Sequence, residues 1–189
     1  SSVVLVACWG VLSGGLHLTS LANTSDAYFA SHGDYTKANL VLQDPTSGPM
    51  AQLVLLAVVI LKVTFVAQLG SSVFWPLLFC LVISRAAFSS YLLTTHYAPA
   101  PDEEGQVVVP AQPRIPVFVY ASSAVLLMAA MLILGFWAAV FAMLLSLVVG
   151  FVWRRTWLRL IGGFTGDTGG ALVEVVEVAV LFAFVIALS

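Results

Sequence analysis

The chain has 189 residues, of which 61% are hydrophobic and only 8% charged, with a formal net charge of −2 at pH 7. A mean hydropathy of +1.05 excludes an ordinary soluble domain. Because the apolar runs are continuous rather than alternating, a β-barrel is disfavoured, and no basic cluster indicates a nucleic-acid partner. We therefore expect an all-α, polytopic helical integral membrane protein whose partner is the lipid bilayer.

Six apolar runs predict about six transmembrane helices. They cover residues 3–18, 50–69, 73–95, 116–135, 138–153 and 170–188. The first run is short and is interrupted by Gly14 and Gly15. We expect the spans to form one transmembrane domain over residues 1–189. Because the chain begins inside an apolar stretch and lacks an initial methionine, we expect it to lack its natural N-terminus.

Three polar stretches, 19–49, 96–115 and 154–169, separate the runs, and counting the crossings places all three on one side of the membrane. The basic residues outside the spans all lie in these stretches, at Lys37, Arg114, Arg154, Arg155 and Arg159. By the positive-inside rule that side is cytoplasmic. We therefore expect a plasma (inner) membrane protein whose polar loops and active face point to the cytoplasm.

Two basic residues, Lys62 and Arg85, lie inside apolar runs. Arg85 is near the middle of its run, where a cation costs about 2.5–3.5 kcal/mol on insertion scales, so Arg85 requires a partner. That partner is either a carboxylate, such as Glu174 or Glu177, or a substrate phosphate in a cavity. The sequence leaves both interpretations open.

The densest polar motif, at residues 162–177, reads GGFTGDTGGALVEVVE and leads into the last apolar run. Its glycines permit sharp bends and the close approach of a ligand. Asp167 or Thr168 is expected to cap a helix that begins at Ala171. The first amides of such a helix attract an anion.

Carboxylates of this motif fall on one side of the predicted helix. Glu174 and Glu177 lie about 60° apart, and Asp167 joins the same stripe if the helix reaches back that far. A divalent cation that bridges these carboxylates and a phosphate would explain the combination. The alternative is ordinary loop and cap chemistry.

The pattern G-G-x-T-G-D-x-x-G-A-x-x-E-x-x-E resembles the C-terminal signature of the cobalamin 5′-phosphate synthases, also called adenosylcobinamide-GDP ribazoletransferases. It occurs here without departure, at Gly162, Gly163, Thr165, Gly166, Asp167, Gly170, Ala171, Glu174 and Glu177. The resemblance implies a Mg²⁺-dependent transferase of late cobalamin biosynthesis. Its substrates would be adenosylcobinamide-GDP and either α-ribazole or α-ribazole 5′-phosphate. The product would be adenosylcobalamin or adenosylcobalamin 5′-phosphate, with release of GMP.

The resemblance extends to residues 17–27, which in the family read H-L-D-G-L-A-D-T-x-D-G. His17 and Asp26 match this segment, whereas Thr19 and Asn23 replace its first two aspartates. The loss of two negative charges is expected to weaken Mg²⁺ binding.

Further matches are partial. Asp44 and Gly48 match a second segment, whose two basic positions are neutral here, at Gln43 and Thr46. Lys62 and the Arg85 of a Ser-Arg pair also fall where the family carries these residues.

The resemblance implies three groups of site residues, without showing which carboxylate acts as the base. The catalytic residues would be Asp26, Asp44 and Asp167. The metal ligands would be Asp26, Asp167, Glu174 and Glu177. The substrate-binding residues would be His17, Lys62, Arg85, Thr165 and Gly166.

Two other function classes stay open. The substitutions at Thr19, Asn23, Gln43 and Thr46 would also suit a non-catalytic homologue that binds without turnover. Intramembrane charges and glycine-interrupted spans occur in small-molecule transporters too. The transporter ranks third, because the chain shows no internal repeat and its acidic residues favour one face. The sequence leaves homo-oligomer formation open.

Overall fold

The computed structural model describes residues 1–44, 46, 48–98, 121, 124–125, 128–129 and 132–188. Its elements are α1 (Ser2–Leu12), α2 (Leu16–Ser31), α3 (Tyr35–Gln43), α4 (Pro49–Leu69), the 3-10 turn η1 (Gly70–Ser72), α5 (Phe74–Thr94), α7 (Phe136–Ile161) and α8 (Gly166–Leu188). No strand occurs among the described residues. The predicted all-α fold is confirmed.

Four helices are long and apolar enough to cross a membrane: α4 with η1, α5, α7 and α8. A fifth span results if α1 and α2 are counted together. The spans predicted at 50–69 and 73–95 agree with α4 and α5 to within one residue. The span predicted at 116–135 lies mostly outside the described residues.

The predicted first span, 3–18, is interrupted at Gly14 and Gly15, as the sequence indicated, and is not one straight helix. Gly14 and Gly15 have φ values of 66° and 67°, a left-handed conformation that glycine adopts without strain. They end α1, and the chain bends by 87° before α2 begins. Residues 16–31, most of which the sequence analysis places in a polar stretch, form helix α2, and polar side chains such as Ser25 and Asp26 are buried in it.

The limits of the last two spans also differ from the prediction. Helix α7 continues eight residues beyond the predicted end at 153, to Ile161. Helix α8 begins at Gly166 rather than at residue 170. The hydropathy pattern marks only the part of a helix that faces lipid, so the polar turns at the ends of both helices were missed.

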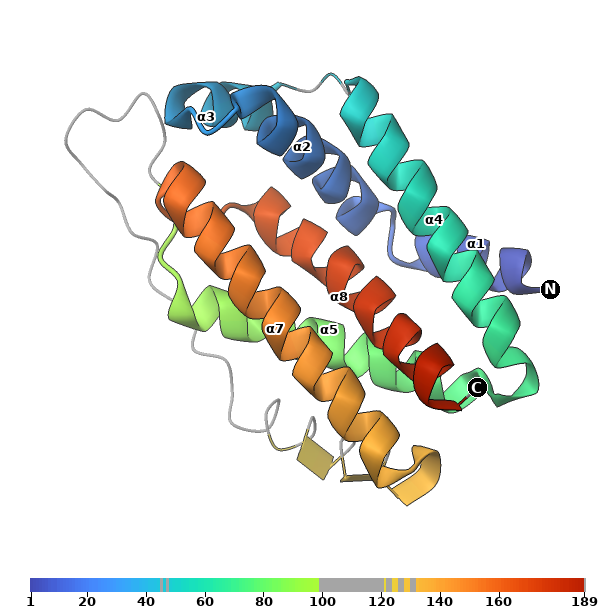
Figure 1. Ribbon diagram of the computed structural model, residues 1–189. Coiled ribbons are helices and arrows are strands. Elements are labelled where there is room, and N and C mark those ends of the chain that lie inside the picture. The colour runs from blue at the N-terminus through green and yellow to red at the C-terminus, as the bar shows by residue number, and fades with distance from the viewer. Residues whose placement is uncertain are drawn as a thin grey trace.

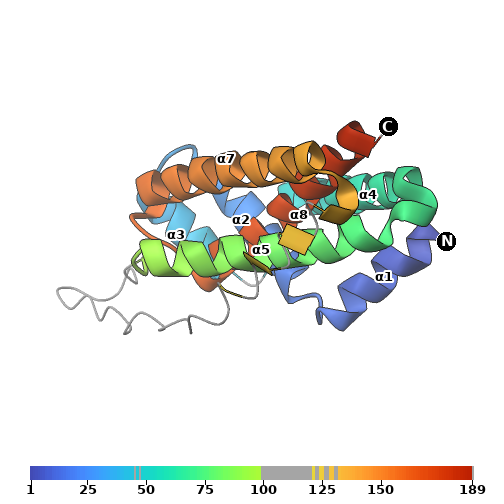
Figure 2. The same ribbon diagram turned by 90° about the horizontal axis from the view of Figure 1, so that it is seen from below.

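Helix α8 lies at the centre of the bundle, with α2, α4, α5 and α7 packed around it (Figures 1 and 2). Its Val176, Val180 and Phe184 are fully buried in the main hydrophobic core. The ring of Phe184 meets that of Phe79 edge to face, 5.5 Å between centroids. Because α8 is enclosed on several sides, the carboxylates that it carries are held inside the protein.

The polar chain segments converge at one end of the bundle. There α2, α5 and α7 end, α4 and α8 begin, and α3 lies across the end, whereas η1 and the C-terminus lie at the opposite end (Figure 1). A short parallel bridge joins Tyr97, after α5, to Phe164, between α7 and α8. The described parts of the three predicted polar stretches therefore share one end, which we call the polar end.

Candidate active site

The start of α8 is fixed by two threonines that cap each other. The Thr168 amide donates to Thr165 Oγ1 at 3.2 Å, and the Thr165 amide donates to Thr168 Oγ1 at 2.8 Å. The prediction that Asp167 or Thr168 caps a helix beginning at Ala171 is therefore wrong. The reciprocal pair satisfies amides of the first turn, so the helix starts earlier and the Asp167 carboxylate can interact elsewhere.

The turn before α8 is held against the end of α5. The Phe164 amide donates to the His96 carbonyl at 3.0 Å, and the Ala98 amide donates to the Phe164 carbonyl at 2.8 Å. A Cβ at Gly163 would lie 2.7 Å from the Ala98 nitrogen, so only glycine fits. Gly162 supplies the left-handed turn that ends α7, with φ of 72°.

The glycines inside α8 permit close helix packing. A Cβ at Gly169 would lie 2.5 Å from the ring of Phe88 in α5. A Cβ at Gly170 would lie 2.5 Å from Ser20 Oγ in α2. These two glycines, expected to admit a ligand, instead admit neighbouring helices to the α8 backbone.

The contact between α2 and α8 joins two of the sequence-predicted positions. Asn23 Nδ2 donates to Asp167 Oδ2 at 3.2 Å, and both side chains are half-buried. Thr19 lies one turn earlier in α2 and is exposed, while His17 Nδ1 lies beside Gly170. Asp167, Asn23 and His17 thus lie along one seam between the helices, which we call the α2–α8 seam.

Glu174 and Glu177 take part in a buried ion cluster. Lys62 Nζ lies 2.6 Å from Glu174 Oε2 and 2.5 Å from Glu177 Oε2. Arg85 pairs with the other oxygen of Glu177, which also accepts from the Ser84 hydroxyl at 3.3 Å. Two cations therefore face two carboxylates, so the cluster is neutral. Of the two interpretations of Arg85, the structure shows the ion pair with Glu177, and Lys62 forms ion pairs with both glutamates as well.

The four charges of the cluster differ in exposure. Lys62 and the two glutamates are all at most 5% exposed. The Arg85 side chain is 41% exposed and reaches the cluster from the side. The ammonium of Lys62 also lies 4.3 Å from the centroid of the Trp9 ring, a favourable cation–π distance. Lys62 is therefore the central cation of the cluster.

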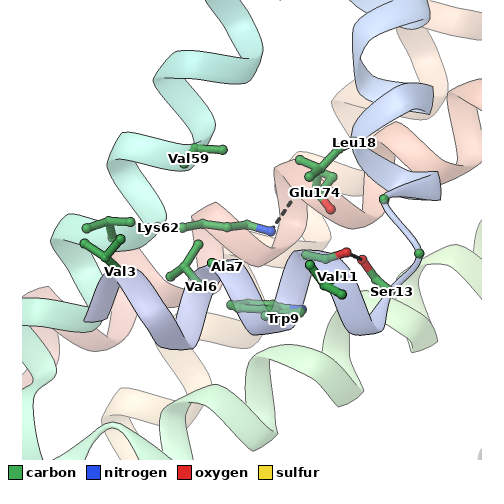
Figure 3. A pocket seen from close by; sticks show the side chains of 14 residues that line it. Val3, Val6, Ala7, Trp9, Val11, Ser13, Leu18, Val59, Lys62 and Glu174 are labelled. Carbon is green, nitrogen blue, oxygen red and sulfur yellow. Dashed lines mark hydrogen bonds and ion pairs between the residues drawn. The ribbon is translucent and has the colours of Figure 1, made fainter. Parts of the chain in front are cut away.

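A cavity of about 610 Å³ opens beside this cluster, between α1, α4 and the turn that precedes α2. Figure 3 shows Lys62 reaching across it to Glu174, with Trp9 below the pair and valines of α1 and α4 around it. Apart from the ion pair, the lining is largely apolar. The cavity therefore suits an apolar group better than a free phosphate.

Asp26 lies apart from the other predicted metal ligands and caps the start of α4. Its carboxylate accepts from the Gly48 amide at 2.5 Å and from the Ala51 amide at 2.8 Å. Gly48 has no side chain with which to cap the helix, so Asp26 replaces the missing cap from another helix. A Cβ at Gly48 would lie 2.9 Å from Asp26 Oδ1, which explains the glycine.

Asp44 lies exposed at the end of α3, away from these groups. Its carboxylate accepts from the Thr46 hydroxyl at 2.6 Å, and this hydrogen bond lowers the pKa of Asp44. No hydrogen bond or ion pair joins Asp44 to another predicted site residue in the described structure.

The structure thus separates the four predicted metal ligands into three places. Asp167 is in the α2–α8 seam, Glu174 and Glu177 are in the ion cluster, and Asp26 is at the start of α4. In the described ranges, no group of three or more His, Cys, Asp or Glu side chains could hold a metal ion. Sequence reasoning missed the Asp26 cap, because nothing in the spacing of Asp26 and Gly48 indicates their contact.

Comparison with known proteins supports the resemblance seen in the motifs. The sequence profile of the cobalamin-5-phosphate synthase family matches residues 1–185. A protein of Pseudomonas fluorescens strain Pf-5, named adenosylcobinamide-GDP ribazoletransferase, is 37% identical over 95% of this chain and 73% of its own length. A protein of the same name from Ectopseudomonas mendocina is 38% identical over 99% of this chain and 75% of its own.

A third relative of that name, from Pseudomonas putida strain KT2440, is 37% identical over 99% of this chain. No solved structure matches the chain. A profile match over nearly the whole chain and relatives above 30% identity agree with the motifs at residues 162–177. The chain belongs to the cobalamin-5-phosphate synthase family.

Proposed function

We propose that this chain is an adenosylcobinamide-GDP ribazoletransferase, which joins adenosylcobinamide-GDP to α-ribazole or its 5′-phosphate. The observation that carries the proposal is the family match over residues 1–185, which includes every position of the C-terminal motif. The geometry agrees with it, since Asp167 of that motif lies against the α2 segment that also resembles the family. No described feature favours a non-catalytic homologue or a transporter.

The release of GMP defines the bonds that change. Because GMP keeps one phosphate, the ribose hydroxyl attacks the phosphorus that is bonded to cobinamide. A new phosphorus–oxygen bond forms to the ribose, and the bond from that phosphorus to the bridging oxygen of GMP breaks. The hydroxyl gives up its proton. The chain must therefore hold a pyrophosphate and provide a proton acceptor near it.

The N-terminal end of α8 can supply both needs. The first amides of a helix bind phosphate oxygens, and Gly166, where α8 begins, is exposed at the polar end. Asp167 is the adjacent carboxylate. We assign Thr165 and Gly166 to pyrophosphate binding and Asp167 to metal or proton binding. His17 lines the same seam.

We propose that Mg²⁺ binds at Asp167, with the Asn23 amide oxygen and the Thr19 hydroxyl as further ligands. Mg²⁺ commonly uses one or two carboxylates together with substrate phosphates, so this small set fits the ion. The Asn23 amide has to turn over to present its oxygen, because its nitrogen faces Asp167 here. When bound, the ion would neutralise pyrophosphate charge. The proposed set leaves out Asp26, Glu174 and Glu177, whose oxygens are engaged elsewhere.

The same proposal places the polar end on the cytoplasmic side of the plasma membrane. The arginines of α7 and Lys37 of α3 support this orientation through the positive-inside rule.

The test is turnover by the purified chain in liposomes that contain adenosylcobinamide-GDP, α-ribazole and Mg²⁺. We expect the cobalamin product and GMP in equal amounts. Asp167→Asn should reduce kcat by 100-fold or more if Asp167 acts in general base catalysis, for which 10²–10⁴-fold is typical. Asp34→Asn is the matched control, because Asp34 caps α3 and asparagine caps equally well.

The metal proposal has a separate test. Restoring two carboxylates with Thr19→Asp and Asn23→Asp should tighten Mg²⁺ binding measured by calorimetry, even without substrate. Equal Mg²⁺ affinity in the parent and the restored variant would contradict the proposed ligands. Equal activity of Asp167→Asn and the parent would contradict the role of Asp167.

A further inference from the structure

A continuous groove runs along the outside of the bundle between α2 and α7. Its apolar part has a volume of about 450 Å³ and is lined by residues that include Thr24, Val148 and Trp153. Its polar part has about 700 Å³ and is lined by residues that include His32, Arg155 and Arg159. Tyr28, Phe29, Val152 and Thr156 line both parts, so the two hollows adjoin.

The arginines of the polar part are free to bind an anion. All ion pairs of the described residues lie in the Lys62–Arg85 cluster, so neither Arg155 nor Arg159 has an acidic partner. Both are exposed, and at a spacing of four they project from the same face of α7. The nearby Asp34 carboxylate accepts a hydrogen bond from the Lys37 amide at the start of α3. The polar part of the groove is therefore cationic.

The position along α7 places these arginines at the membrane surface. From Phe136 to Trp153 the helix carries no charged residue, and at 1.5 Å per residue this stretch is about 27 Å long. A bilayer core is about 30 Å thick. Arg155 and Arg159 therefore lie at the level of lipid headgroups, while Val148 and Val152, on the same side of the helix, lie at the level of the acyl chains.

The wall of the apolar part also contains an unsatisfied polar atom. Thr24 Oγ1 is the one buried side-chain oxygen or nitrogen without a hydrogen-bond partner in the described part of the chain. Its side chain is 1% exposed and belongs to the groove lining. A buried hydroxyl without a partner is costly, and an ester carbonyl in the groove would accept its proton.

We propose that this groove binds an anionic phospholipid, with the phosphate on Arg155 and Arg159 and one acyl chain between α2 and α7. Basic pockets between transmembrane helices recognise anionic headgroups in this way. The aromatic rings of Tyr28 and Trp157, 6.4 Å apart, stand at the interface level, where aromatic side chains are favoured. The occupant is a membrane lipid rather than a soluble phosphate, because the cationic part continues into an apolar one.

A bound lipid would also contact the residue that supports the start of α8. Trp153 is part of the groove wall, and its indole N–H donates to the Thr168 carbonyl at 2.8 Å. Thr168 follows Asp167 directly. Occupation of the groove therefore stabilises the end of α8 that carries the proposed active site, and bound lipid should raise the melting temperature.

The experiment places the parent chain and its variants in nanodiscs of phosphatidylcholine with and without phosphatidylglycerol, and measures retained lipid by native mass spectrometry. We expect preferential retention of phosphatidylglycerol by the parent and a higher melting temperature with it. Arg155→Gln with Arg159→Gln should reduce that preference about 25-fold, because each basic residue contributes about a factor of five. Lys37→Gln, a cation of α3 outside the groove, is the charge control and should retain the preference.

A second pair of variants tests the acyl chain. Val148→Trp fills the apolar part and should reduce retention, whereas Leu144→Trp, on the exposed surface of α7 outside the groove, should not. Equal retention of both lipids by the parent would overturn the proposal, as would an equal loss in Lys37→Gln and the double variant. Full competition by soluble glycerol phosphate would also overturn it, since the site would then bind phosphate alone.

Discussion

Replacing Lys62 by methionine removes the central cation of the buried cluster. Two carboxylates, Glu174 and Glu177, are then left with one cation, Arg85. Lys62 contacts both glutamates, at 2.6 and 2.5 Å, and is 5% exposed. Breaking a buried pair by removing one partner costs about 3–5 kcal/mol. At about 2–4 °C per kcal/mol for a chain of this size, we expect the melting temperature to fall by about 6–20 °C.

The other cation should matter less, which provides an internal comparison. The Arg85 side chain is 41% exposed and pairs with one glutamate only, and Glu177 keeps Lys62 when Arg85 is lost. We therefore expect Arg85→Gln to lower the melting temperature less than Lys62→Met does. The double variant Lys62→Met with Glu174→Gln leaves one carboxylate and one cation, and should recover much of the stability lost in Lys62→Met.

The assay is thermal unfolding of detergent-solubilised protein, followed by loss of the monodisperse peak in size-exclusion chromatography. A melting temperature of Lys62→Met within 2 °C of the parent would refute the cluster as a source of stability. So would a double variant that melts below Lys62→Met, because removing a stranded carboxylate would then have harmed the fold.

Three further predictions concern packing, capping and orientation. Gly170→Ala should lower the stability of the fold by about 1–3 kcal/mol, because the added Cβ would meet Ser20. Ser20→Gly should partly restore that stability. Gly166→Ala is the control and should be nearly neutral in the same thermal unfolding assay, because nothing lies within 4 Å of the added Cβ. Asp26→Ala should lower the stability of the fold by about 2 kcal/mol in the same assay, because it leaves the Gly48 and Ala51 amides unpaired. If Asp44→Ala, at an exposed position, lowered the stability as much, the capping role of Asp26 would be contradicted. Lys37→Cys, made in a variant that lacks Cys8 and Cys80, places a single cysteine at the exposed polar end. This cysteine should not react with membrane-impermeant thiol reagents added to intact cells, because the polar end is proposed to face the cytoplasm. Labelling from outside would show the opposite orientation.

The long apolar helices could be predicted from the sequence because lipid selects a continuous apolar run. Helices α4 and α5 follow the predicted runs closely. Helix α2 could not be found this way, because its polar side chains are buried against protein rather than exposed to lipid. Thr24 and Asp26 there are 1% and 8% exposed, and a hydropathy pattern assigns such residues to a loop.

The sequence predicts the carboxylates that α8 contributes to the candidate site, but not the residues of other helices that they contact. Helical spacing places Asp167 and Glu174 on one stripe, and α8 does extend through both. The stripe is not one metal site, because α8 meets different helices along its length. Asp167 faces Asn23 of α2, whereas Glu174, seven residues later, faces Lys62 of α4. Only the packing of three helices decides between these partners.

The difference between these carboxylates follows from their depth in the membrane. Asp167 is in the first turn of α8 and half-buried at the polar end, where a hydrated ion and a pyrophosphate can reach it. Glu177 lies ten residues later, about 15 Å along the helix, and is fully buried. A lone carboxylate at that depth is too costly to remain charged, so it is paired with Lys62 and Arg85. Lys62 and Arg85, which the family resemblance assigned to a substrate phosphate, are thus paired with the glutamates, and for this reason we propose the helix end and Mg²⁺ for phosphate binding instead.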